Sequence, residues 1–142
     1  MSKRAAAAYG VPGDRGRVLL ARADRLLMEA AGESDPRERF LTAYLAALRG
    51  AGAVIAALDP VKPRRGSRSA WVLLTKAAPE FVMWADYFAD RSSTRAALEA
   101  GISRPVSTET ADDFFTRVGA FLHDVEDLIG DESRLPGSLE SA

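Results

Sequence analysis

Apolar residues recur along this chain at the three- and four-residue spacing of an α-helix, and no useful stretch alternates as a strand does. The pattern predicts a first helix from Asp14, a good N-cap residue, to Ala31. It predicts a second helix from Pro36 to Leu58, because Asp35 suits the N-cap and proline suits the first helical position. The short connection between the two favours an antiparallel pair.

Three more helical segments are expected further along the chain. The first spans residues 69–89, and Pro79 within it predicts a kink or a break. Ser93 is the expected N-cap of a short helix over residues 94–100, and a long last helix spans about 108–130. The pattern therefore predicts an all-α fold, an antiparallel bundle of four to five helices. The expected boundaries are 1–13 for a flexible leader, 14–130 for the helical domain and 131–142 for a disordered acidic tail.

Small residues form a second stripe on the helix expected from Pro36 to Leu58. Between Phe40 and Leu58 the only charge is Arg49, so nearly the whole surface of this helix is apolar or small. Such a helix belongs at the centre of a bundle or in a subunit interface, where small side chains let another helix come close. The small stripe consists of Ala46, Gly50, Ala53 and Ala57.

The composition is that of an ordinary globular protein and excludes several kinds of site. The 142 residues suit one domain, with 47% hydrophobic and 27% charged residues. The absence of cysteine excludes disulfides, cysteine-bound zinc and a thiol nucleophile, and it fits a cytoplasmic protein. The first residues lack the apolar region of a signal peptide, and no apolar run approaches the ~20 residues that span a bilayer, so we expect no membrane association.

Charge is divided unevenly along the chain, although the net charge is −1. Residues 1–106 carry 17 basic and 11 acidic side chains, a net charge of +6. Residues 107–142 carry 2 basic and 9 acidic side chains, a net charge of −7. The basic part is able to bind an anionic partner, or the two parts pair with each other inside the fold.

Several sequence blocks resemble a small stand-alone HEPN-domain family of high-GC bacteria. They follow the order and spacing of that family over roughly residues 15–129, but they consist mainly of packing residues. The resemblance therefore supports the fold more strongly than any particular chemistry. The blocks are YLAALRGAGAV from Tyr44, SAWVLL from Ser69, APEFVMWADYF from Ala78, RAALEAGI from Arg95, and the shorter ADD from Ala111 and FL from Phe121.

The resemblance implies a helical bundle that is often dimeric. Many HEPN proteins are ribonucleases of toxin–antitoxin, CRISPR or RNA-processing systems. Others are non-catalytic modules that bind nucleotides or RNA, often together with a nucleotidyltransferase. The catalytic members carry an arginine and a histidine four to six residues apart on a late helix, and two copies of this motif meet across a dimer.

Arg117 and His123 are the residues to which the resemblance assigns catalysis, as an Arg-x5-His pair of a metal-independent endoribonuclease. Six residues of helix separate two side chains by about 120°. The residue after Arg117 is the apolar Val118, where active members usually carry a polar one. We therefore favour a surface histidine and an arginine that pairs with Asp113 or Asp124, while catalysis across a dimer stays an alternative.

Two further sets of cations are candidates for binding nucleic acid or another anion. Arg49, the lone charge on an apolar helix, is either part of a structural ion pair, which we favour, or an anion-binding residue in a surface groove. A proline- and glycine-containing loop offers flexible cations for phosphate contacts, and a merely solvated loop is supported equally well. The loop cations are Lys62, Arg64, Arg65 and Arg68.

The aromatic residues of the third helical region have two interpretations. Their helical spacing favours core packing over a surface on which bases stack. The residues are Trp71, Trp84, Tyr87 and Phe88.

Three functions follow from these observations. We expect a non-catalytic HEPN-like module that binds RNA, a nucleotide or a protein partner, and that forms a homodimer. The alternatives are the ribonuclease and a structural dimerisation bundle built on the small stripe. We expect no cofactor and no metal site, because the acidic residues near the start of the last helix are explained by the helix dipole.

Overall fold

In the computed structural model every described element is a helix, so the expected all-α class is confirmed. The structure describes residues 12–58, 69–101 and 106–141, and the side chains of 15–58, 69–101 and 106–131. The elements are α2 (Pro12–Gly32), α3 (Pro36–Leu58), α4 (Ala70–Ala77), the 3-10 helix η1 (Pro79–Phe81), α5 (Val82–Ala100) and α6 (Thr108–Ser141).

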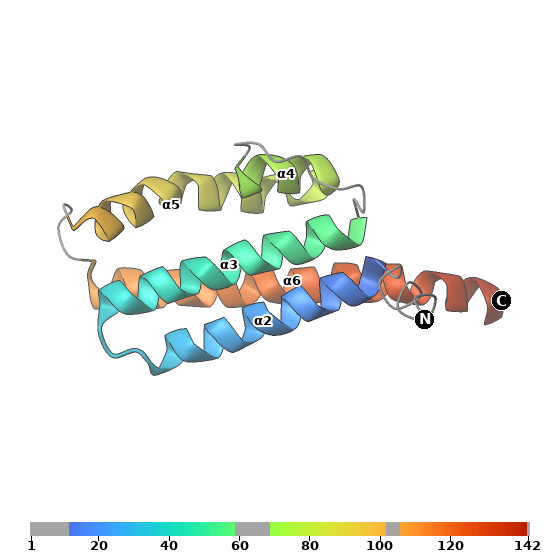
Figure 1. The fold of residues 1–142 in the computed structure, drawn as a ribbon, viewed down its shortest axis with the longest axis horizontal. Helices are drawn as coiled ribbons and strands as arrows, with labels where there is room; N and C mark the ends of the chain where they lie inside the picture. Colours follow the sequence, from blue (N-terminus) through green and yellow to red (C-terminus); the bar gives the residue numbers. More distant parts are fainter. Residues whose placement is uncertain (1–11, 59–68, 102–105, 142) are drawn as a thin grey trace, which may run out of the picture.

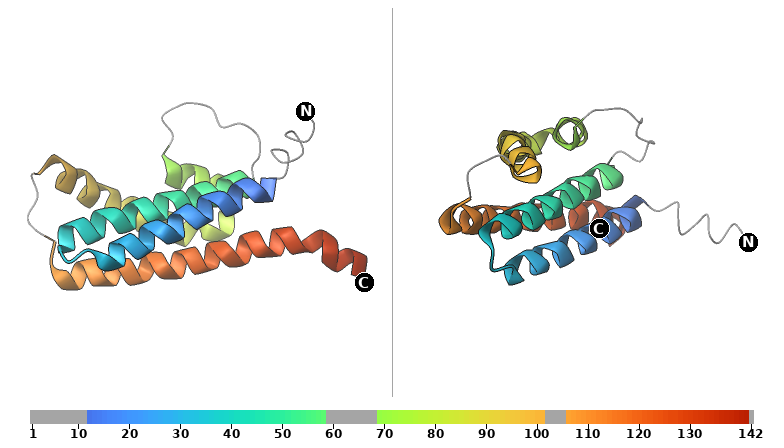
Figure 2. Two further views of the ribbon diagram at one scale, coloured as in Figure 1. Left: turned by 60° about the horizontal axis from the view of Figure 1, so that its bottom comes forward. Right: turned by 60° about the vertical axis from the view of Figure 1, so that its left-hand side comes forward.

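Helix α3 lies at the centre of the bundle and packs against α2, α6, α4 and α5 (Figure 1). The helices α2, α3 and α6 lie side by side, and α4 and α5 cover another side of α3 (Figures 1 and 2). Helix α2 runs antiparallel to α3, and α5 runs antiparallel to α6. The central position that the apolar pattern predicts for α3 is therefore observed within one chain.

The small stripe of α3 is used for close packing inside the chain. Ala46, Gly50 and Ala53 are buried. A Cβ atom added to Gly50 would lie 2.5 Å from Leu122 Cδ2, and Ala57 Cβ lies 3.2 Å from the corresponding position on Gly16. Helices α6 and α2 of the same chain therefore pack against the stripe at Gly50 and at Ala57. Three of its four residues are thus engaged inside one chain, which is the close-packing role that the sequence offered beside a subunit interface.

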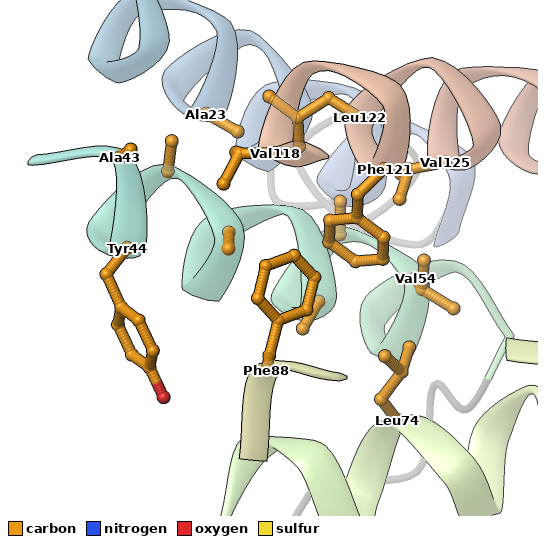
Figure 3. Packing of buried hydrophobic residues seen from close by; sticks show 14 of the residues in the cluster. Ala23, Ala43, Tyr44, Val54, Leu74, Phe88, Val118, Phe121, Leu122 and Val125 are labelled. Carbon is orange, nitrogen blue, oxygen red and sulfur yellow. The ribbon is translucent and has the colours of Figure 1, made fainter. Parts of the chain in front are cut away.

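Aromatic rings fill the layer between α3 and the helices α4 and α5. Trp71 and Phe88 are buried, and their rings stack with centroids 4.9 Å apart. Trp84 and Tyr87 lie at the edge of this layer and pack against the same core. The core interpretation of these aromatic residues is therefore the one that the structure supports (Figure 3).

In the middle of the chain, the helix cap and the helix break that the sequence predicts are both observed. Asp35 Oδ1 accepts a hydrogen bond from the Arg37 backbone N–H at 3.2 Å, as expected of an N-cap. Ala78, with φ −141° and ψ 85°, separates α4 from η1, so the break expected near Pro79 is confirmed. At the end of α5, Gly101 has φ 73°, a left-handed conformation that glycine adopts without strain.

The prediction of a separate short helix over 94–100 is wrong, because α5 runs from Val82 to Ala100 without interruption. Neither serine at positions 92 and 93 breaks the helix, and the Ser92 hydroxyl donates to the Ala89 carbonyl at 2.7 Å. A hydroxyl that bonds to the preceding turn leaves the helix intact, so the cap signal at Ser93 was misleading.

Two helix ends lie further out than the sequence predicts. Helix α2 begins at Pro12 and not at Asp14, because proline is well suited to a first helical position. Helix α6 continues past Gly130 to Ser141. Most of the expected leader, residues 1–11, lies outside the described residues.

Helix α3 is long and apolar enough to cross a membrane by length and composition alone. The expectation that no segment approaches that length is therefore wrong. Within the bundle, 44% of the most apolar part of this helix is buried, and four other helices pack against it. Burial at the centre of the bundle accounts for its apolar character without a membrane.

Candidate functional site

Arg117 and His123 both lie on α6 but have different surroundings. The Arg117 guanidinium lies 5.6 Å from the centroid of the Tyr87 ring on α5, and its Nε lies 3.9 Å from Asp113 Oδ1. His123 Nε2 lies 3.8 Å from Asp127 Oδ2, and 73% of the histidine side chain is exposed. Arg117 therefore faces α5, whereas His123 points into solvent.

This separation bears directly on catalysis. A metal-independent ribonuclease needs a base for the 2′-hydroxyl and a cation for the phosphate, and both must reach one phosphodiester. On the continuous helix α6 the two side chains project about 120° apart. One chain therefore does not bring Arg117 and His123 to a common phosphate.

Arg49 is exposed on α3, and it forms no ion pair with any side chain that the structure describes. The structural ion pair that we favoured is thus not found among these residues. The reason is that α3, although central, is not enclosed all round. Gly50 and Ala53 face its neighbours, while Leu45, one turn before Arg49, is 37% exposed.

Arg22 of α2 lies at the same level as Arg49 on the outer surface of the α2–α3 pair. A Cβ atom on Gly52 would lie 3.8 Å from Leu19 Cδ1, which fixes where the two helices meet. The helices are antiparallel (Figure 1), so Arg22, three residues after Leu19, and Arg49, three residues before Gly52, are displaced in the same direction along the helix pair. The two arginines therefore lie at the same level. Arg15, one turn before Leu19, continues this surface, which we call the α2–α3 basic face and define as Arg15, Arg22 and Arg49.

None of the three arginines forms an ion pair with a carboxylate among the described side chains. Helix α3 has no acidic residue after Glu38. Asp24 of α2 points toward α6, since burial and then the neighbouring Glu126 raise the pKa of its carboxyl above the ordinary value of 3.8. The guanidinium groups of the three arginines are therefore not engaged by a carboxylate in the described part of the chain.

A second polar region, which sequence analysis missed, is a cleft of about 330 Å³ between α5 and α6. The start of α3 contributes Phe40 to its wall, so three helices far apart in the sequence build it. No spacing along one helix reveals such a cleft. We call it the α5–α6 cleft, and its lining residues are Phe40, Tyr87, Asp90, Arg91, Thr94, Thr110, Asp113 and Phe114.

Tyr87 is the least expected member of this cleft. Its hydroxyl oxygen is buried and has no hydrogen-bond partner among the described residues. Burial raises the pKa of the phenol, and Asp113 adds to this, against the opposing effects of Arg91 and Arg117. The phenol therefore stays protonated at neutral pH.

The remaining candidates give no site in the described part of the chain. The cationic loop with Lys62, Arg64, Arg65 and Arg68 lies outside the described residues. Among the described side chains, no group of three or more histidine, aspartate or glutamate residues is arranged to hold a metal ion.

Comparison with known families places this geometry in context. The family model described as SAV_6107-like HEPN matches residues 30–126, from the end of α2 to the middle of α6. No curated protein and no solved structure is significantly similar to the chain. The family match spans more than half of the chain, so the chain belongs to the SAV_6107-like HEPN family.

Proposed function

We propose that this HEPN domain is a non-catalytic module that binds single-stranded RNA through phosphate contacts. The observation that carries the proposal is the position of Arg22 and Arg49, which are exposed at the same level of two adjacent helices and have no ionic partner among the described residues. An unpaired guanidinium has its donors available for a phosphate, because no internal carboxylate competes for them.

The α2–α3 basic face has the size and rigidity that phosphate contacts require. Arg15 and Arg22 are two turns apart on α2, about 10 Å along the helix axis. Both helices are held firmly by the bundle, so the guanidinium groups start from fixed backbone positions. Arginine forks bind phosphate oxygens in pairs, which gives geometric preference as well as charge.

The absence of catalysis in this proposal rests on the surroundings of Arg117 and His123. Arg117 is near Asp113 and the Tyr87 ring, and His123 is near Asp127. Each of the two side chains thus lies beside a different aspartate of α6, which favours a structural role for both. A ribonuclease that uses the two residues across a dimer is the alternative that the experiments below separate from binding.

Salt-dependent RNA binding tests the proposal. Fluorescence anisotropy of a labelled single-stranded RNA, measured at several salt concentrations, gives the number of phosphate contacts from the slope of log affinity against log salt. Each contact contributes about −0.7 to this slope for a single strand. The double variant Arg22→Gln and Arg49→Gln should therefore reduce the slope by about 1.4.

Arg95→Gln is the matched control, because Arg95 is also an arginine of a surface helix but pairs with Glu99, 3.2 Å away on α5. It should leave the slope unchanged. The proposal fails if wild-type protein shows no salt-dependent binding. It also fails if Arg95→Gln weakens binding as much as the double variant does.

A further inference from the structure

Arg25 adds a further arginine beside the α2–α3 basic face. It lies one turn after Arg22, its side chain is exposed, and it forms no ion pair or hydrogen bond with any described residue. From Arg15 to Arg25 the helix rises by about 15 Å, the length of roughly four to five phosphates at the ~3.4 Å spacing of a stacked strand. Arg25 and the basic face are therefore long enough together to contact one stretch of a phosphate chain at several points.

Glu29 marks the end of this surface. It is exposed and lies two turns after Arg22 on the same side of α2. A carboxylate at this position repels a phosphate, so a bound chain lies between Arg25 and the start of α2 and reaches across to Arg49. The extent of the surface is therefore set by its own charges.

The side chains around these arginines contain little that recognises a base. Helix α2 has no aromatic residue and no serine, threonine, asparagine, glutamine or histidine. After Tyr44, Arg49 carries the only hydrogen-bonding side chain of α3, and the two aromatic side chains of α3, Phe40 and Tyr44, are each 1% exposed. The two helices therefore present no ring on which an unpaired base stacks.

The exposed apolar side chains near these arginines do not distinguish bases either. Val18 of α2 is 53% exposed and Leu45 of α3 is 37% exposed, and neither side chain has a π face or a hydrogen-bonding group. The whole sequence contains no asparagine or glutamine, the residues whose amides pair with adenine. Recognition by this surface is therefore left to the charge and the donors of its arginines.

We propose that the α2–α3 basic face, extended by Arg25, binds the phosphate chain alone and accepts any base or sugar. The inference rests on the proposed function and names the chemical class of its ligand, a flexible chain of closely spaced phosphates. Guanidinium groups donate paired hydrogen bonds to charged phosphate oxygens, which RNA, DNA and inorganic polyphosphate all present. A single-stranded nucleic acid and inorganic polyphosphate are thus two sources of the same chemistry.

Fluorescence anisotropy with labelled strands of about 12 nucleotides, longer than the arginines span, tests this inference. The probes are oligo-U RNA, oligo-dT, and an abasic strand in which tetrahydrofuran replaces each deoxynucleoside. A guanine-containing RNA is added because a guanidinium also fits the two acceptors of guanine. All four should bind with affinities within about threefold of one another, less than the factor of about five that one stacked base contributes.

Arg25→Gln should reduce the slope of log affinity against log salt by about 0.7 for each of these single strands. Arg95→Gln, whose arginine pairs with Glu99, is the control and should leave the slope unchanged. Competition with inorganic polyphosphate identifies the source. Displacement of labelled oligo-U at a lower phosphate concentration than unlabelled oligo-U requires supports polyphosphate, and displacement at a higher concentration supports a nucleic acid.

The inference is overturned if the abasic strand binds at least about fivefold more weakly than oligo-dT, the effect of one stacked base. It is also overturned if the guanine-containing strand binds more tightly than oligo-U by such a factor, or if Arg25→Gln leaves the slope unchanged. Salt-dependent binding of oligo-U together with any of these results leaves the RNA-binding function standing. Absence of salt-dependent binding of oligo-U overturns both proposals, so their failures are seen separately.

Discussion

The indole N–H of Trp71 donates a hydrogen bond to the Tyr44 hydroxyl, 2.9 Å away, between α4 and the central helix α3. Both side chains are almost completely buried, with 5% and 1% of their surface exposed. The two rings meet edge to face with centroids 6.0 Å apart. This pair fixes α4 against α3 by polar as well as apolar contact, although the two residues lie 27 positions apart.

Tyr44→Phe should lower the free energy of unfolding by about 1–3 kcal/mol, because it leaves a buried indole donor without a partner. Urea denaturation followed by circular dichroism measures the loss. The double variant with Trp71→Phe removes the orphaned donor as well. A loss in the double variant equal to the sum of the two single losses would contradict a direct hydrogen bond.

Gly50→Ala should destabilise the bundle by about 1–3 kcal/mol, the usual cost of adding atoms to a packed core. Its new Cβ would lie 2.5 Å from Leu122 Cδ2 and 3.1 Å from Phe121 Cε2, and both neighbours are buried. Gly119→Ala is the matched control on α6, where the nearest atom is Leu27 Cδ2 at 3.7 Å.

The control should gain up to about 1 kcal/mol, since alanine favours a helix more than glycine does. Thermal unfolding of the two variants separates the effects. Equal shifts of the melting temperature in both would show that α3 and α6 do not approach closely at Gly50.

Tyr87→Phe should leave stability unchanged or increase it by up to about 1 kcal/mol. The Tyr87 hydroxyl is buried without a partner among the described residues, so the folded state loses its hydration without gaining a hydrogen bond. Removing the hydroxyl removes this desolvation penalty. The ring contacts with Phe88 and Phe114 are kept. A loss of more than about 1 kcal/mol in chemical denaturation would mean that the hydroxyl has a partner after all.

Glu126→Gln should stabilise the fold at pH 7 by a few tenths of a kcal/mol, because both carboxyl groups are largely exposed and solvent screens their repulsion. Asp24 has a raised pKa in the folded state, caused by burial and then by Glu126. A raised carboxyl pKa contributes stability below the ordinary value of 3.8, and this contribution is lost as the pH rises through the folded-state pKa.

The gain from Glu126→Gln should therefore shrink as the pH falls and vanish below 3.8, where Asp24 is protonated in both states. Melting temperatures of wild type and variant between pH 3 and pH 8 measure this difference. A gain that is independent of pH would argue against repulsion between the two carboxyl groups.

Sequence alone predicted the helical class and the central place of α3, because both follow from periodicity and cap residues. Asp35 and Pro79 act locally, so their effects were readable from neighbouring residues. Ser93 was misread, since a serine side chain serves a cap and a helix interior equally well.

The candidate sites were less accessible to sequence reasoning. Helical geometry on α6 was enough to argue that Arg117 and His123 diverge, because both lie on one element. The partners of Arg49 depend on how α2 lies against α3, which no local pattern gives. The α5–α6 cleft depends on three helices, and the unpartnered hydroxyl of Tyr87 appears only when those helices are assembled.

The most direct test of a non-catalytic, RNA-binding role is incubation of end-labelled single-stranded RNA with the purified protein, with binding and cleavage measured in the same samples. We expect salt-dependent binding without cleavage above the buffer control, in wild type and in His123→Ala alike. Cleavage by the wild type that His123→Ala abolishes, while binding is kept, would contradict it and establish a catalytic role for the histidine.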